Sequence, residues 1–234
     1  MSLNENIVVP INLGLVSAFL IKGSKPILVD TGYKDSEDKI IKAIEANGVN
    51  PKEIELIIIT HGHNDHFGSA KALREKLGAK IAIHNKDVDN IIKGTNGDLE
   101  PKGIFLKVLF FISNLFGKKT KDEGLEPDII IEDEINLNSY GVNGRIIFTP
   151  GHTKGSISIL LDNGDAIIGD LLMKLLPWGK PSKAAWAEDV KESDISTKKL
   201  IELAPKNIYM SHGGVTNINE IAPRFKDIKF SGKC

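Results

Sequence analysis

Half of the six histidines in this 234-residue chain lie in one short stretch, THGHNDHFGS at residues 60–69. It contains His61, His63, Asp65 and His66, and it directly follows the apolar run ELIIIT. A continuous apolar run predicts a strand that is buried on both faces. Residues i and i+2 of an extended chain point the same way, so we expect His61 and His63 to face one direction. Imidazoles and carboxylates are ligands of zinc, iron and manganese, which predicts a metal site where this strand ends.

Three further residues repeat this context later in the chain. His152 lies in TPGHTKGS after the strand-like run RIIF, Asp170 ends AIIGD, and His212 lies in YMSHGG after NIYM. A lone histidine in a loop is usually a surface or core residue. For residues 60–69 the alternative is a polar loop whose histidines are solvated. Repetition of one setting, a strand end beside glycine, instead favours convergence of all these side chains at one site.

Strand-like and helix-like segments alternate along the chain. The runs NIVVPINL, VSAFLIKG and KPILVDTG predict hairpin-connected strands, and KIAIH, PDIII, GRIIFT, SISILLD and DAIIGD predict further strands. The segments SEDKIIKAIEANGVN, GSAKALREKLG and DVKESDISTKKLIELA have the apolar spacing and the end signals of helices. Direct strand-to-strand connections mixed with strand–helix alternation predict mixed sheets with helices outside. We expect residues 1–234 to form a single domain.

Composition excludes several classes of protein. A net charge of −1 offers no electrostatic case for nucleic-acid binding. The single cysteine, Cys234, excludes a disulfide within the chain. No signal peptide opens the sequence, and no apolar run reaches the roughly 18 residues that a membrane span needs. We therefore expect a cytoplasmic protein without a transmembrane segment.

The motifs resemble those of the metallo-β-lactamase superfamily. HGHNDH matches the HxHxDH motif of that family, and PGHT, GD and SHGG look like its later metal motifs in the right order. LVDTG at residues 28–32 is similar to its early strand-end motif, and the resemblance spans about residues 8 to 214. It implies an α/β fold, a four-layer αββα sandwich of two mixed β-sheets with helices outside. It also implies a dinuclear metal site at one edge, between the sheets.

The resemblance assigns the ligands to two divalent metal ions, with zinc expected first and iron or manganese as alternatives. One ion would be bound by His61, His63 and His152, the second by Asp65, His66 and His212, and Asp170 would bridge the two.

Three other residues near the motifs have different expectations. Asp30 would orient a ligand histidine through a hydrogen bond, and the alternative is a turn aspartate. Thr153 is a weaker candidate for the same role, against simple turn chemistry. His84 ends the run KIAIH without matching any motif, so we do not expect it to bind metal.

The implied chemistry is metal-dependent hydrolysis of an ester, thioester, lactone or related small molecule by a hydroxide shared between the metals, with Asp65 transferring a proton. Asp170 stands where some zinc β-lactamases carry cysteine, and Met173 where quorum-signal lactonases carry tyrosine. The helical C-terminal domain of glyoxalase-II-like thioesterases has no counterpart in the 22 residues after His212. The alternatives are a di-iron protein that reduces oxygen or nitric oxide, and a phosphodiesterase or nuclease of the same superfamily.

Candidate substrate-pocket residues lie in two segments, residues 103–117 and the loop after Asp170 that contains Met173, Trp178 and Trp186. GIFLKVLFFISNLFG at residues 103–117 predicts an insertion whose helix is apolar on nearly all sides, so it is either buried or faces something apolar. Three alternatives compete for this helix: a core or dimer-interface helix, a lid over an apolar substrate, and a membrane-surface helix. We predict a hydrophobic element beside the active site that favours apolar substrates and also mediates a homodimer. The pocket candidates are Phe110, Phe111, Met173, Trp178 and Trp186, although the tryptophans fit a packing role equally well.

Overall fold

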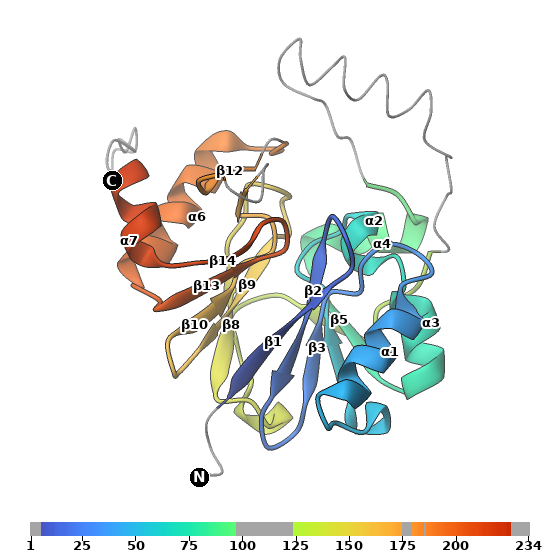
Figure 1. Cartoon of the computed structure of the whole chain (residues 1–234). Coiled ribbons are helices and arrows are strands. Elements are labelled where there is room, and N and C mark those ends of the chain that lie inside the picture. Colours follow the sequence, from blue (N-terminus) through green and yellow to red (C-terminus); the bar gives the residue numbers. More distant parts are fainter. Residues whose placement is uncertain (1–5, 97–123, 175–178, 185, 226–234) are drawn as a thin grey trace.

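Two mixed sheets form the centre of the protein, and helices cover both outer faces (Figure 1). The computed structural model describes residues 6–96, 124–174, 179–184 and 186–225. Within these ranges each of the two sheets has six strands, and a two-stranded ribbon pairs Leu172–Met173 (β11) with Ser182–Lys183 (β12). The predicted α/β four-layer sandwich is therefore confirmed.

The first sheet has the strand order β1-β2-β3-β4-β5-β6. Its first three strands are antiparallel, as the hairpin prediction required, and β3 to β6 run parallel to one another. Its strands are β1 (Ile7–Asn12), β2 (Ser17–Lys22), β3 (Ile27–Val29), β4 (Leu56–Ile58), β5 (Lys80–His84) and β6 (Ile129–Ile131).

The second sheet has the order β14-β13-β10-β9-β8-β7. Only β10 and β13 are parallel neighbours in it, and every other pair is antiparallel. Its strands are β7 (Ile135–Asn136), β8 (Gly144–Phe148), β9 (Ile157–Leu161), β10 (Asp165–Ile167), β13 (Asn207–Met210) and β14 (Gly214–Thr216). The short strands β7, β11, β12 and β14 were not predicted from the sequence. They fall outside the β-branched apolar runs that predicted the other short strands, β3, β4, β6 and β10.

The helices lie on the outer faces or at the sheet edge that carries the loops. Those described are α1 (Glu37–Ala46), α2 (Asn64–Phe67), α3 (Ala70–Leu77), α4 (Val88–Lys93), α6 (Val190–Glu202) and α7 (Ile218–Ile221), with 3₁₀ turns at Pro51–Glu53, Asn85–Asp87, Asn138–Tyr140 and Ala222–Arg224. The helices expected from SEDKIIKAIEANGVN, GSAKALREKLG and DVKESDISTKKLIELA correspond to α1, α3 and α6. No helix in the described ranges is both long and apolar enough to cross a bilayer.

Three apolar layers hold the sandwich together. One lies between the first sheet and α1 and α3, a second lies between the two sheets, and a third lies between the second sheet and α6 and α7. Strand β4 shows how a doubly buried strand serves two layers: Ile57 packs toward the helices, and Ile58 packs toward the other sheet. This alternation follows from the pleat, and it explains why ELIIIT is apolar at consecutive positions.

The insertion at residues 103–117, with Phe110 and Phe111, lies outside the described residues. Trp178 lies outside them as well. The roles predicted for these residues stay predictions.

The central position of β4 generates a stability prediction. Ile57 is fully buried and pairs with Leu28 and Ile81 on the neighbouring strands. Ile57→Ala should lower the free energy of unfolding by about 2–5 kcal/mol, because it removes apolar contacts and leaves a cavity. Ile130→Ala is the matched control on the edge strand β6, where the side chain is 52% exposed, and its cost should stay within about 0.5 kcal/mol. Denaturant unfolding of the metal-free protein measures both, and equal losses would contradict the layer assignment.

Candidate metal centre

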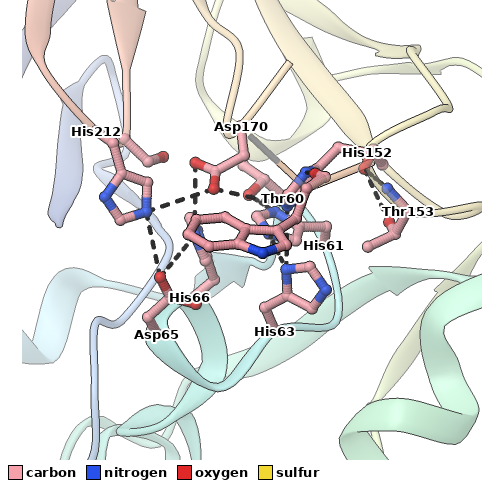
Figure 2. Close-up of polar contacts among 12 residues, drawn as sticks. Thr60, His61, His63, Asp65, His66, His152, Thr153, Asp170 and His212 are labelled. Carbon is pink, nitrogen blue, oxygen red and sulfur yellow. Dashed lines mark hydrogen bonds and ion pairs between the residues drawn. The ribbon is translucent and has the colours of Figure 1, made fainter. Parts of the chain in front are cut away.

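The strand topology brings the predicted ligands to one edge of the sandwich. Strands β8 and β10 run the same way because both are antiparallel to β9, and β13 is parallel to β10. Their carboxyl ends therefore lie at the same edge, and His152, Asp170 and His212 follow them. The loop after β4 joins this edge through a hydrogen bond from the Ile157 nitrogen to the Thr60 oxygen, 2.9 Å long. Figure 2 shows the labelled histidines and aspartates of both sheets pointing into one shared space.

Three imidazoles form the first group. The Nδ1 atom of His63 lies 3.0 Å from Nε2 of His61 and 3.0 Å from Nε2 of His152. All three side chains are buried. The residues come from the β4–α2 loop and from the loop after β8, so the group spans the two sheets.

The second group combines histidines and carboxylates. Nε2 of His212 lies 3.2 Å from Oδ2 of Asp65, and Nε2 of His66 lies 3.7 Å from the same atom. Asp170 lies between the two groups: its carboxylate oxygens are 3.4 Å from His212 Nε2, 3.7 Å from His66 Nε2 and 3.6 Å from His152 Nε2. The seven predicted ligands are thus brought together.

Hydrogen bonds to Nδ1 orient four of the rings. His66 Nδ1 faces Asp30 Oδ2 at 2.8 Å, His212 Nδ1 faces the Leu15 carbonyl at 2.7 Å, and His61 Nδ1 faces Thr60 Oγ1 at 3.1 Å. His152 Nδ1 faces the Trp186 carbonyl. A ring that donates its Nδ1 proton to oxygen presents the Nε2 lone pair to the shared space. His63 is reversed and presents Nδ1.

Asp30 connects several segments at this sheet edge through hydrogen bonds to its carboxylate. Its Oδ1 accepts the Thr60 backbone N–H at 2.8 Å, and its Oδ2 accepts the Thr60 hydroxyl at 2.9 Å as well as the His66 ring. The Ser211 hydroxyl reaches Oδ2 from the second sheet at 3.4 Å. Asp30 is fully buried and has a left-handed backbone with φ 59°.

The two groups differ in electrostatics. Burial, reinforced by the neighbouring histidines, lowers the pKa of His61 well below its ordinary value, and burial lowers the pKa of His63 to about 3. Burial alone would also lower the pKa of His66, but the carboxylates of Asp65, Asp30 and Asp170 outweigh it and raise that pKa well above its ordinary value. The first group thus presents neutral imidazoles, and the second concentrates negative charge. Neutral imidazoles beside carboxylates are the donor set that a divalent cation requires.

Unpaired atoms support the fit to a cation. His66 Nε2 and Asp170 Oδ1 are buried without a hydrogen-bond partner. Buried polar atoms are rarely left unpaired, because each costs roughly 1–3 kcal/mol. Within the described residues, candidate ligand atoms that lie within 4.8 Å of one another form three overlapping groups: His61, His63 and His152; His61, His66 and Asp170; Asp65, His66 and His212.

Comparison with known proteins agrees with this geometry. The family model described as the metallo-beta-lactamase superfamily matches residues 11–212. The chain belongs to the metallo-β-lactamase superfamily. It is 36% identical over 157 residues to a probable metallo-hydrolase of Methanocaldococcus jannaschii, an alignment that covers 67% of this chain and 66% of the relative. It is also 25% identical over 202 residues to a beta-lactamase-like protein 2 homolog of Drosophila melanogaster, covering 86% of this chain and 59% of that one. The chain thus spans about three fifths to two thirds of the length of these relatives.

Solved structures show the same fold at lower identity. An archaeal superfamily protein from Sulfolobus tokodaii superposes with a TM-score of 0.66 at 22% identity, covering 99% of this chain and 88% of that chain. A protein solved in a di-iron-bound form has a TM-score of 0.67 at 22% identity, covering 92% of this chain and 97% of that one.

The remaining predicted residues have various placements. Trp186 is half-buried and contacts His152 through its backbone oxygen. Met173 is buried in β11, with 4% of its surface exposed. His84 lies away from the seven residues and stacks on Phe148 at 4.4 Å. The hydroxyl of Thr153 bonds to Asp87 rather than to a histidine.

Sequence reasoning missed three residues at this edge. Thr60 bridges Asp30 and His61, and Asp87 bonds to both loops of the three-histidine group. The third is Tyr33, whose pKa is raised to about 12 by burial and by the charges of Asp65 and Asp170. Thr60 directly precedes the histidine motif, which was a usable signal. Asp87 and Tyr33 carried none, because they match no motif.

The Asp30 network generates a prediction about the fold of the site. In Asp30→Asn, the amide NH₂ must face either the Thr60 backbone N–H or the pair formed by the Thr60 hydroxyl and the His66 ring, so at least one donor loses its acceptor. We expect the free energy of unfolding of the metal-free protein to fall by about 1–3 kcal/mol.

Asp35→Asn is the matched control, because Asp35 also has a left-handed backbone (φ 68°) but is exposed. Its unfolding midpoint in denaturant should stay at the wild-type value. Equal midpoints for the two variants would show that the Asp30 carboxylate does not organise this edge.

Proposed function

We infer that this protein is a metal-dependent hydrolase that uses two metal ions. The observation that carries the proposal is the pair of adjoining ligand groups around Asp170, with unpaired buried atoms directed into the space between them. Membership of the superfamily and the similarity to a probable metallo-hydrolase support it.

The proposed ligands divide as the two groups do. His61, His63 and His152 would hold one ion, and Asp65, His66 and His212 the other, with Asp170 shared. Two bound divalent ions supply a hydroxide near neutral pH and polarise the oxygen of the group that is cleaved. Asp30, Thr60 and the carbonyls of Leu15 and Trp186 keep the ring nitrogens pointed inward.

Asp65 is the proposed proton carrier. It is held between His212 and His66, and although burial would raise its pKa, the neighbouring histidines lower it. The carboxylate is therefore ionised near neutral pH, so it would accept the proton of the hydroxyl group that the nucleophile has added to the substrate, as the intermediate collapses. Its position lets it pass that proton on to the leaving group within the same space.

We propose an ester, thioester or lactone of a small molecule as substrate. The proposed nucleophile requires no serine or cysteine, and Asp170 would be shared by the two ions. Apolar specificity and a homodimer through residues 103–117 stay predictions, as do the pocket roles of Phe110, Phe111, Met173, Trp178 and Trp186 and a cytoplasmic location.

One observation is relevant to the choice between zinc and iron. A structural neighbour was solved in a di-iron-bound form, so iron is the first alternative to zinc, and a redox function is the alternative that goes with it. His63 disfavours redox chemistry, because di-iron reductases of this superfamily often carry a carboxylate at that position.

The first prediction from this proposal concerns metal stoichiometry. Purified protein saturated with zinc, iron or manganese and then desalted should contain two ions per chain by elemental analysis. His152→Ala and His212→Ala should each retain one ion, because each leaves one ligand group complete. His84→Ala is the control, since it removes a buried histidine outside both groups and should retain two. A saturated wild type that never exceeds one ion would overturn the dinuclear proposal.

The second prediction concerns Asp65. Asp65→Asn should lower kcat/KM on any ester, thioester or lactone that the wild type hydrolyses by about 10²–10⁴-fold, because the proton acceptor is lost. Asp162→Asn, an exposed carboxylate in the turn after β9, should retain wild-type activity. If Asp65→Asn bound both ions and turned over at a near-normal rate, the proton-carrier role would be wrong.

A further inference from the structure

A buried carboxylate outside the seven ligand residues joins the two loops of the three-histidine group. Asp87 is 1% exposed and ends the 3₁₀ turn Asn85–Asp87, before α4. It occupies the N-cap position of α4, but its side chain makes no capping hydrogen bond there. The carboxylate is directed away from its own helix, toward the metal-ligand loops.

Three hydrogen bonds define what this carboxylate does. Oδ2 accepts the Gly62 backbone N–H at 2.7 Å and the Thr153 hydroxyl at 2.6 Å, and Oδ1 accepts the Gly155 backbone N–H at 2.9 Å. Gly62 lies between His61 and His63, and Thr153 directly follows His152. Asp87 thus links the loop of the first sheet to the loop of the second sheet that completes the group.

Close packing shows that the chain is built around this contact. A Cβ added at Gly155 would lie 2.6 Å from both Cγ and Oδ1 of Asp87. One added at Gly62 would lie 2.9 Å from Cβ of Asn90 and 3.1 Å from the Asp87 carbonyl oxygen, so the backbone of this segment also lies against the first loop. A side chain at Gly155 would therefore push the carboxylate away from the loops. Gly155 is thus explained by the approach of Asp87, not by a turn requirement.

The charge of Asp87 has a role that a neutral group would not fill. Its three donors are uncharged, and burying a carboxylate is costly unless its charge is compensated. A cation bound by His61, His63 and His152 would place positive charge beside the two loops that Asp87 holds, and this charge would lower the cost of burying the carboxylate. Partners that orient metal ligands typically change metal affinity by about 10–100-fold when removed.

We propose that Asp87 is the positioning residue of the three-histidine metal group: it sets the relative placement of His63 and His152 and raises the metal affinity of that group. This inference rests on the proposed two-ion site. It assigns Asp87 no contact with substrate.

The test separates the two groups before it removes Asp87. In a His212→Ala background only the three-histidine group is complete, and in a His152→Ala background only the other group is. Asp87→Asn is added to each, because an amide cannot satisfy all three donors. Zinc affinity is measured by competition with a chromophoric chelator, and the geometry of the three-histidine group by the visible absorption of bound cobalt(II).

Asp89→Asn is the matched control on α4, since the Asp89 side chain is 80% exposed and pairs only with Lys93 among the described residues. We expect Asp87→Asn to weaken zinc binding by about 10–100-fold in the His212→Ala background and to change its cobalt spectrum. Binding in the His152→Ala background, and binding by Asp89→Asn in either, should stay within twofold of the parent.

Equal weakening in both backgrounds would overturn the inference, because it would indicate general loosening of the fold. Unchanged affinity in the His212→Ala background would overturn it as well. If Asp87→Asn does not fold, Thr153→Val and Thr153→Ser decide: loss of the hydroxyl should weaken the three-histidine group, and its retention in serine should restore it. Equal affinities for the valine and serine variants would reject the inference.

Failure of the proposed function gives a different result. If the unmodified chain binds fewer than two ions, the two-ion site itself is wrong, whatever the Asp87 variants do. If the chain binds two ions and Asp87→Asn binds them as tightly, only the positioning role is wrong.

Discussion

The buried carboxylate of Asp30 is the interaction on which the arrangement of the site depends. Its oxygens accept hydrogen bonds from Thr60 after β4, from His66 in α2 and from Ser211 after β13, so one side chain connects both sheets and helix α2 of the candidate metal centre. Fixing His66 through Nδ1 leaves Nε2 free for a cation, and fixing Thr60 orients His61 in turn. Loss of any of these contacts would leave a buried donor unpaired, which makes the network mutually dependent.

The cost of this arrangement explains why a cation fits it. The carboxylates of Asp30, Asp65 and Asp170 lie beside the five imidazoles of the site. Most of these groups are buried. Burial lowers the pKa values of His61, His63 and His152, whereas the carboxylates of Asp65, Asp30 and Asp170 raise the pKa of His66. Such groups are expensive to bury in an empty site, and two divalent ions would satisfy their lone pairs and charges together.

Rigid apolar layers beneath the loops give the site its precision. Strands such as β4 contribute residues to two layers at once, so the strand ends that carry the ligands cannot move independently. Loops mounted on such a scaffold are free to vary in other members of a superfamily while the metal ligands stay in place. This is why superfamily membership supports metal-dependent hydrolysis here more strongly than it supports any particular substrate.

The sequence by itself determined the elements with strong periodicity and the set of candidate metal ligands that the fold brings together. ELIIIT predicted a doubly buried strand, α1, α3 and α6 followed from their apolar spacing, and the strand-end histidines and aspartates pointed to one site. Strands β7, β11, β12 and β14 were not predicted, because their two or three residues lie outside any β-branched apolar run.

Only the tertiary structure decided which ring nitrogen faces inward and which residues hold the rings. Asp87 and Thr153 are 66 positions apart, and Asp30 and Ser211 are 181 apart. A hydrogen bond between such residues depends on how the two sheets pack, and local sequence spacing contains no record of that packing.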